Sequence, residues 1–120
     1  MSGNLPDDVA DVLGLVLDGD DPVRAALRGH VPYLRVTSRC TCGCGSAYFA
    51  LDTGEVDRAP TGPGAVVAAD ALLYTEAGDC PGEVLVVARD GCLAWLEVCS
   101  WSDDIEVTLT AARRWLRPSP

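Results

Sequence analysis

Residues 83–101 constrain the fold of this chain more than any other segment, because two apolar runs there flank the dipeptide Asp90-Gly91. An Asp-Gly pair in this setting predicts a two-residue type I′ turn, since both central residues of that turn need a positive φ. Such a turn joins two antiparallel strands in one defined register. The predicted pairs are Arg89 with Cys92, Val87 with Ala94, and Leu85 with Leu96.

Both faces of this predicted hairpin are apolar, because successive side chains of a strand point to opposite faces. One face would carry Leu85, Val87, Ala94, Leu96 and Val98, and the other Val84, Val86, Ala88, Leu93 and Trp95. Such strands need cover on both sides, from helices, from a curled sheet or from a partner subunit. Glu97 is the odd polar residue on the Trp95 face, where it marks a sheet edge, a binding surface or a partner for an arginine such as Arg35.

Two helices are predicted near the N-terminus. Residues 5–17 carry one apolar stripe at helical spacing, and Asn4 is the expected N-cap. A shorter helix is expected over residues 22–28. Asp21 would cap its start and Gly29 would end it in a left-handed conformation.

The segments between these helices and the hairpin follow the period of strands. Residues 33–40 alternate, which places Leu34, Val36, Ser38 and Cys40 on one inward face. Residues 47–51 are the expected antiparallel partner, and the Gly- and Pro-rich residues 53–64 are typical of a surface loop. Residues 66–74 fit either a helix or a strand. We predict a strand, because a second Gly/Pro loop and then the hairpin follow.

A last helix is expected over residues 109–116, capped by Thr108 and ended by Pro118. A chain of 120 residues supports one domain. The predicted fold is therefore a single α+β domain over residues 1–120. In it, an N-terminal helical pair packs on an antiparallel sheet of about five strands, and a short C-terminal helix completes the domain.

The charge of the chain argues against two classes of partner. Nine arginines, no lysine and eighteen acidic residues give a net charge of −9. Nucleic acids and anionic membranes attract clustered basic residues, so neither is expected as a partner. The acidity has two possible explanations: a basic protein partner, or solubility combined with biased codon usage. No apolar run is long enough for a membrane span, and the N-terminus lacks the basic region that begins a secretory signal. Both observations predict that the protein is located in the cytoplasm.

Three of the six cysteines, Cys40, Cys42 and Cys44, alternate with small residues in the motif RCTCGCGS. At a hairpin tip this pattern would bring three sulfurs together, and His30 or another cysteine could complete a tetrahedral zinc site. The spacing is not the C-x₂₋₄-C of common zinc sites. Two alternatives therefore stand beside zinc: reduced thiols that hold no cofactor, and a redox pair or disulfide within the cluster.

The sequence contains no combination of residues that defines a catalytic site. His30 is the single histidine, and no nucleophile motif or phosphate-binding loop accompanies it. We therefore expect a small cytoplasmic binding protein without catalysis, whose partner is an unknown protein, a basic one or a second copy in a homodimer. Trp95, Glu97 and Trp101 are the candidate contact residues, because tryptophan is enriched among interface anchors. A zinc-binding module and a thiol redox protein, both using the cysteine cluster, are the alternative hypotheses.

RCTCGCGS and EVLVVARDGCLAWLEVCSW together resemble a group of short, acidic, uncharacterised proteins of high-GC Gram-positive bacteria. In that group a C-x-C-like turn precedes a final meander of the form V-x-V-L-x-x-x-x-D-G-x-L-x-x-L-E-V. The resemblance covers about residues 33–102. It implies no particular activity. In size and fold style, some such α+β proteins are similar to the immunity proteins of bacterial toxin systems.

Overall fold

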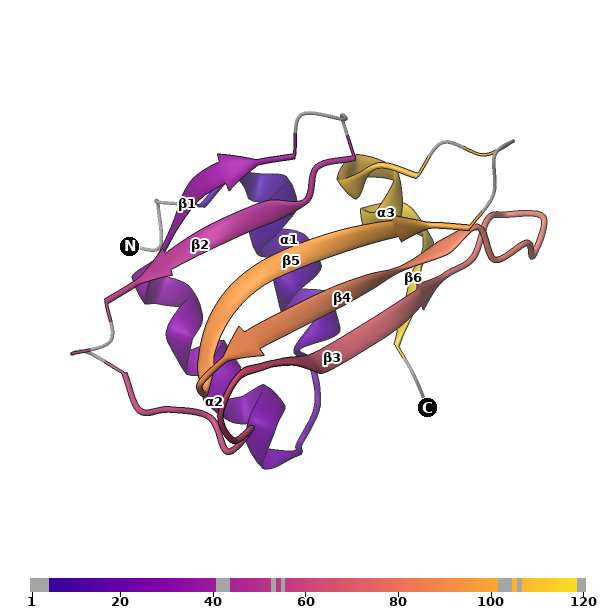
Figure 1. The fold of residues 1–120 in the computed structure, drawn as a ribbon. Coiled ribbons are helices and arrows are strands. Elements are labelled where there is room, and N and C mark those ends of the chain that lie inside the picture. Colours follow the sequence, from indigo (N-terminus) through magenta and orange to yellow (C-terminus); the bar gives the residue numbers. More distant parts are fainter. Residues whose placement is uncertain are drawn as a thin grey trace.

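The computed structural model describes residues 5–40, 44–52, 54, 56–101, 105 and 107–118. These residues form three α-helices packed on one face of a six-stranded antiparallel sheet with strand order β1-β2-β5-β4-β3-β6 (Figure 1). The elements in chain order are α1 (Asp7–Val16), α2 (Pro22–His30), a 3₁₀ turn η1 (Val31–Tyr33), β1 (Leu34–Arg39), β2 (Ala47–Leu51), β3 (Ala65–Leu73), β4 (Gly82–Arg89), β5 (Cys92–Ser100), α3 (Leu109–Trp115) and β6 (Leu116–Pro118). The α+β fold with its five predicted strands is confirmed, and β6 is an additional short strand.

The helix starts follow the capping signals of the sequence more closely than the helix ends do. The Asp21 carboxylate accepts the Arg24 backbone N–H at 3.0 Å, and Thr108 accepts the Ala111 N–H at 3.2 Å, so both predicted caps are confirmed. The prediction that Asn4 caps the first helix was wrong, because α1 begins at Asp7 with Pro6 at its N-cap position and no side-chain cap hydrogen bond; Asn4 itself lies outside the described residues. The prediction that Gly29 ends α2 was wrong. The helix continues to His30 and into η1, because the buried His30 side chain anchors its last turn.

The C-terminal helix ends one residue earlier than the sequence pattern predicts. Trp115 is its last residue, and Leu116 already belongs to β6, where it pairs with Leu73 at the edge of the sheet. The Trp115 carbonyl accepts the Tyr74 N–H at 2.8 Å. The change from helix to strand thus buries Leu116 and pairs backbone groups of β3.

The predicted hairpin is β4–β5, and its turn has the expected conformation. Asp90 and Gly91 both have positive φ, 53° and 82°. The Arg89–Cys92 pair is confirmed, but Val87 pairs with Trp95 and Leu85 with Glu97. The predicted pairs Val87–Ala94 and Leu85–Leu96 were wrong, because Ala94 is an extra residue at a β-bulge.

The bulge changes which residues of β5 face the helices. The face toward the helices carries Val84, Val86, Ala88, Leu93, Leu96 and Val98, each at most 8% exposed. Leu93 lies on this face as predicted, but Trp95 lies on the opposite face with Glu97, Leu85 and Val87, so the predicted faces of Trp95, Leu96 and Val98 were wrong. In Figure 1 the described helices all lie behind the sheet, and the face toward the viewer carries none of them.

A second bulge changes the alternation in β1. The register of the β1–β2 pair shifts between Val36 and Ser38, so that Ser38 is exposed rather than inward as predicted. Arg39 instead points toward the helices, where its guanidinium contacts an Asp8 oxygen at 3.2 Å and the Gly45 carbonyl at 2.9 Å. This ion pair links the end of β1 to the first turn of α1.

Candidate functional site on the open face of the sheet

We use the term open face for the side of the sheet that the described helices leave uncovered. One continuous row of paired residues crosses it, from Tyr48 through Trp95 and Val87 to Val67. The Tyr48 and Trp95 rings are 6.2 Å apart between centroids. Tyr48 is 44% and Val67 56% exposed, whereas Val87 between the neighbouring strands is only 5% exposed. The centre of the open face is therefore an apolar, aromatic row that is partly in water.

Opposite charges flank this row along the strands. On the side toward the Asp90–Gly91 turn, the Arg89 guanidinium lies 5.3 Å from the centroid of the Trp95 ring, a favourable cation–π distance. On the other side, Glu97 and Asp70 are the cross-strand neighbours of Leu85. The open face thus has a basic end and an acidic end, with the aromatic row between them.

The arginines at the basic end differ from the others in the described part of the chain. Arg35, Arg58 and Arg89 have no carboxylate partner among the described residues. Arg58 only donates to the Asp90 carbonyl, at 3.4 Å. The other arginines whose side chains are described form the pairs Arg24–Asp21, Arg39–Asp8, Arg113–Asp11 and Arg114–Glu76, or, for Arg28, donate to backbone carbonyls. Within the described ranges, three arginines without a carboxylate partner therefore lie toward the Asp90–Gly91 end of the sheet, together with the exposed Asp90, whose carboxylate accepts the Gly64 N–H at 2.7 Å.

Glu97 connects two other side chains on the open face. One carboxylate oxygen accepts the Trp95 indole N–H at 3.2 Å, and the other accepts the Cys99 thiol at 3.3 Å. Burial and then the neighbouring Glu97 carboxylate raise the pKa of the Cys99 thiol to about 11. Trp95 and Cys99 are thus held by one acidic side chain, and Cys99 stays a thiol at neutral pH.

We expect Cys99 to react slowly with iodoacetamide below pH 9 and to reach half its maximal rate near pH 11. Because the pKa in the folded chain lies above its ordinary value of 9.0, Cys99 contributes stability below pH 9 that is lost as the pH rises toward 11. Peptide-resolved mass spectrometry of alkylation measures the first effect, and urea denaturation at several pH values the second. Glu97→Gln lowers the pKa of Cys99 in the same assay. An unchanged alkylation profile in Glu97→Gln would contradict this role of Glu97.

The predicted cysteine cluster falls partly outside the described residues, because Cys42 is not among them. Cys40 donates its backbone N–H to the Ser46 carbonyl at 2.9 Å, and the Cys44 Sγ lies 3.2 Å from the Ser46 hydroxyl. That hydroxyl also accepts the Val98 N–H at 2.9 Å. Cys40 and Cys44 therefore lie within the β1–β2 connection, near the Val98 end of β5, and the three-sulfur arrangement stays a prediction.

His30 lies at the other end of β5 from these cysteines. Its side chain is 1% exposed, its Nε2 is 2.7 Å from the Asp57 carbonyl, and its Nδ1 accepts the Leu93 N–H at 3.4 Å. Both ring nitrogens are thus engaged with backbone groups. Across the described ranges, no three His, Cys, Asp or Glu side chains gather as a metal site would require.

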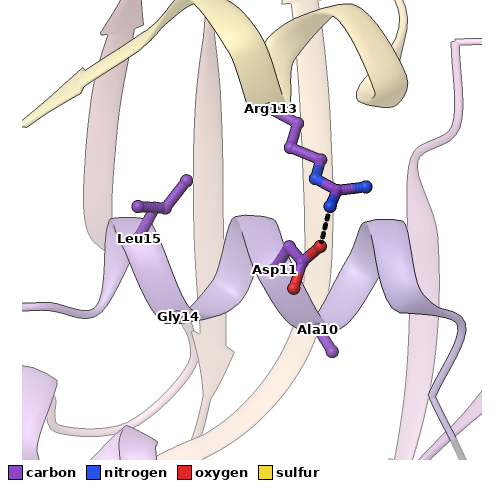
Figure 2. A pocket seen from close by; sticks show the side chains of 5 residues that line it. All are labelled: Ala10, Asp11, Gly14, Leu15 and Arg113. Carbon is purple, nitrogen blue, oxygen red and sulfur yellow. Dashed lines mark ion pairs between the residues drawn. The ribbon is translucent and has the colours of Figure 1, made fainter.

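A shallow pocket between α1 and α3 is a weaker candidate site. It is lined by Ala10, Asp11, Gly14, Leu15 and Arg113. Figure 2 shows the Asp11 and Arg113 side chains pointing toward each other, and their ion pair measures 2.7 Å. Because this pair satisfies both charged groups, the pocket offers a ligand little beyond small side chains and the exposed Leu15.

Of the three predicted contact residues, the structure brings two together. Trp95 and Glu97 share the open face and a hydrogen bond. Trp101 lies beyond the end of β5, 57% exposed, with its backbone N–H on the Pro81 carbonyl. No signal in the sequence marks Tyr48, Val67, Asp70 or Arg89 as site residues. The pairing of neighbouring strands places them near Trp95. In the sequence, only the alternation of side chains along each strand indicates which face of the sheet they occupy.

Comparisons with protein-family models, with curated proteins and with solved structures gave no match for this chain. No helix in the described ranges is both long enough and apolar enough to span a bilayer. The fold and the site define a class of molecule by geometry alone: an α+β domain that presents an open sheet face with an aromatic centre and oppositely charged ends.

Proposed function

We propose that this chain is a non-catalytic protein-binding domain whose contact surface is the open face of the sheet. One observation carries the proposal: Tyr48, Trp95 and Val67 form a partly exposed apolar row between a basic end and an acidic end of the sheet. Protein interfaces combine an apolar, aromatic centre with a polar rim in this way, and Trp, Tyr and Arg dominate their binding energy.

Two further observations support binding over catalysis. Both nitrogens of His30 are engaged with backbone groups, and a general base needs one of them available to a substrate. Cys99 on the open face has a raised pKa, which is opposite to the shift that activates a nucleophilic or redox thiol.

The free thiols Cys80, Cys92 and Cys99 support the cytoplasm as the proposed compartment, because thiols persist in reducing surroundings.

The test compares two tyrosines of similar exposure. Tyr48 on the open face is 44% exposed, and Tyr33 in η1 is 42% exposed. We expect Tyr48→Ala to weaken partner binding at least about tenfold, as removal of an interface anchor does, and Tyr33→Ala to leave it unchanged. Partners are enriched on the immobilised chain from lysate of its own cells, identified and purified. Their affinities for both variants are then measured by isothermal titration calorimetry.

Equal affinities of the Tyr48 and Tyr33 variants would show that partners bind elsewhere and would overturn the proposal. Urea denaturation of both variants checks that a loss of partner binding does not result from unfolding. Trp101→Ala, at the most exposed of the three predicted contact residues, reports whether the contact extends beyond the end of β5.

A further inference from the structure

We propose that the occupant of the open face is a second copy of this chain, packed face to face about a two-fold axis. This inference rests on the proposed function of the open face and specifies the partner. Two-fold homodimers bury the same patch on both subunits, so the patch must complement itself. The open face meets this requirement, because its two ends carry opposite charges on either side of an apolar centre.

The cross-strand register defines the positions that would meet. Along β4, Leu85 lies one outward-facing position before Val87, and Arg89 lies one outward-facing position after it, next to the Asp90–Gly91 turn. Asp70 and Glu97 flank Leu85 on the two neighbouring strands. Arg89 and the two carboxylates therefore stand at about equal distances on opposite sides of the central row, roughly one strand repeat away.

The two-fold axis between two stacked sheets can run either perpendicular or parallel to the strands, and the charges of the open face favour the first of these directions. An axis along the central row, perpendicular to the strands, reverses the strand direction of the second copy. Arg89 of one copy then faces Asp70 and Glu97 of the other, and the two central rows pack on each other. An axis parallel to the strands would instead place Arg89 opposite the second copy's own Arg89, and like charges across an interface are unfavourable.

Charge also distinguishes a second copy from a basic protein. The net charge of −9 favours a basic partner at long range. At contact distance, however, such a partner would meet Arg35, Arg58 and Arg89 at one end of the open face. The repulsion between two acidic copies acts over long distances and is screened at physiological salt, where the Debye length is about 8 Å. Contacts between Arg89 and the facing carboxylates are screened much less.

The experiment uses two charge reversals at exposed positions, Arg89→Glu and Asp70→Arg, and measures mass by sedimentation equilibrium at physiological salt. We expect the wild-type chain to have twice its monomer mass and each variant alone to dimerise at least about tenfold more weakly. An equal mixture of the two variants restores the dimer. In the mixed dimer the two substituted positions face each other with opposite charges, and the unchanged Asp70 of the first variant faces the unchanged Arg89 of the second.

Asp18→Arg is the matched control, since Asp18 is an exposed acidic residue in the α1–α2 connection, on the helix side of the molecule. It makes the same charge change as Asp70→Arg and leaves dimerisation unchanged. Circular dichroism verifies that all variants fold.

A wild-type chain that stays monomeric up to about 1 mM would overturn the inference, as would variants that dimerise alone as well as in mixture. These outcomes leave the proposed function testable by itself. If Tyr48→Ala still abolishes the binding of another purified protein, the open face is a binding surface for a different partner. If the chain dimerises and the mixture shows no preference, the dimer uses another surface.

Discussion

Leu96→Ala will lower the free energy of unfolding by about 2–5 kcal/mol, the range for truncating a fully buried leucine. Leu96 is 0% exposed and packs in the core under the helices, because the bulge at Ala94 turns it to that face. Urea denaturation followed by tryptophan fluorescence measures the change. Leu85→Ala is the matched control: Leu85 lies on the open face and is half-buried, so its truncation will cost clearly less.

This pair of variants also tests the register of the hairpin. Without the bulge, Leu85 and Leu96 would be direct partners on one face, and their truncations would have similar effects. Equal losses in Leu85→Ala and Leu96→Ala would therefore contradict the observed register. Sub-micromolar protein keeps self-association from contributing to the stability of either variant.

His30→Ala will lower the free energy of unfolding by about 3 kcal/mol or more. The substitution leaves the buried Leu93 N–H without its acceptor, and an unsatisfied buried group costs about 1–3 kcal/mol. It also removes the donor to the carbonyl of the exposed Asp57. A cavity adds to this loss. Urea denaturation is again the measurement, and His30→Phe separates the two contributions, because phenylalanine fills much of the space but has no ring nitrogen.

The same variants distinguish this structural role from zinc binding. A structural role predicts that EDTA leaves the stability of the wild-type chain unchanged. If His30 instead completes a zinc site with Cys40, Cys42 and Cys44, EDTA destabilises the wild-type chain and has no effect on His30→Ala, since metal binding contributes directly to folding. A His30→Phe variant as stable as the wild type would contradict the hydrogen-bonding role.

The bulge at Ala94 creates the candidate site as well as the core. One extra residue moves Leu96 and Val98 under the helices and leaves Trp95, Glu97 and Cys99 on the open face. Had the strand kept its alternation, Trp95 would lie in the core and two leucines would oppose each other on the open face. The aromatic row and its flanking charges thus depend on a local irregularity of one strand.

Part of this site was predictable from the sequence, and part was not. Trp95 and Glu97 were identified as contact residues, since a tryptophan and a carboxylate in an otherwise apolar hairpin are conspicuous. Tyr48 and Asp70 were not, because their strands meet β5 and β4 only through long-range pairing. His30 follows Gly29, the predicted end of the second helix, but its burial depends on Asp57 and Leu93, which are distant in the sequence.

The amino-acid sequence by itself determined the features whose signals are local: the helix starts at Asp21 and Thr108, the turn at Asp90-Gly91, and the number of main strands. Capping and turn conformations depend on a few adjacent residues, which explains this success. Only the tertiary structure decided the bulges, the sixth strand and the helix-free side of the sheet. These features depend on which apolar residues, distant in the sequence, are buried together in one core. Burying Leu96 and Val98 under the helices stabilises the fold more than the regular alternation of the strand would.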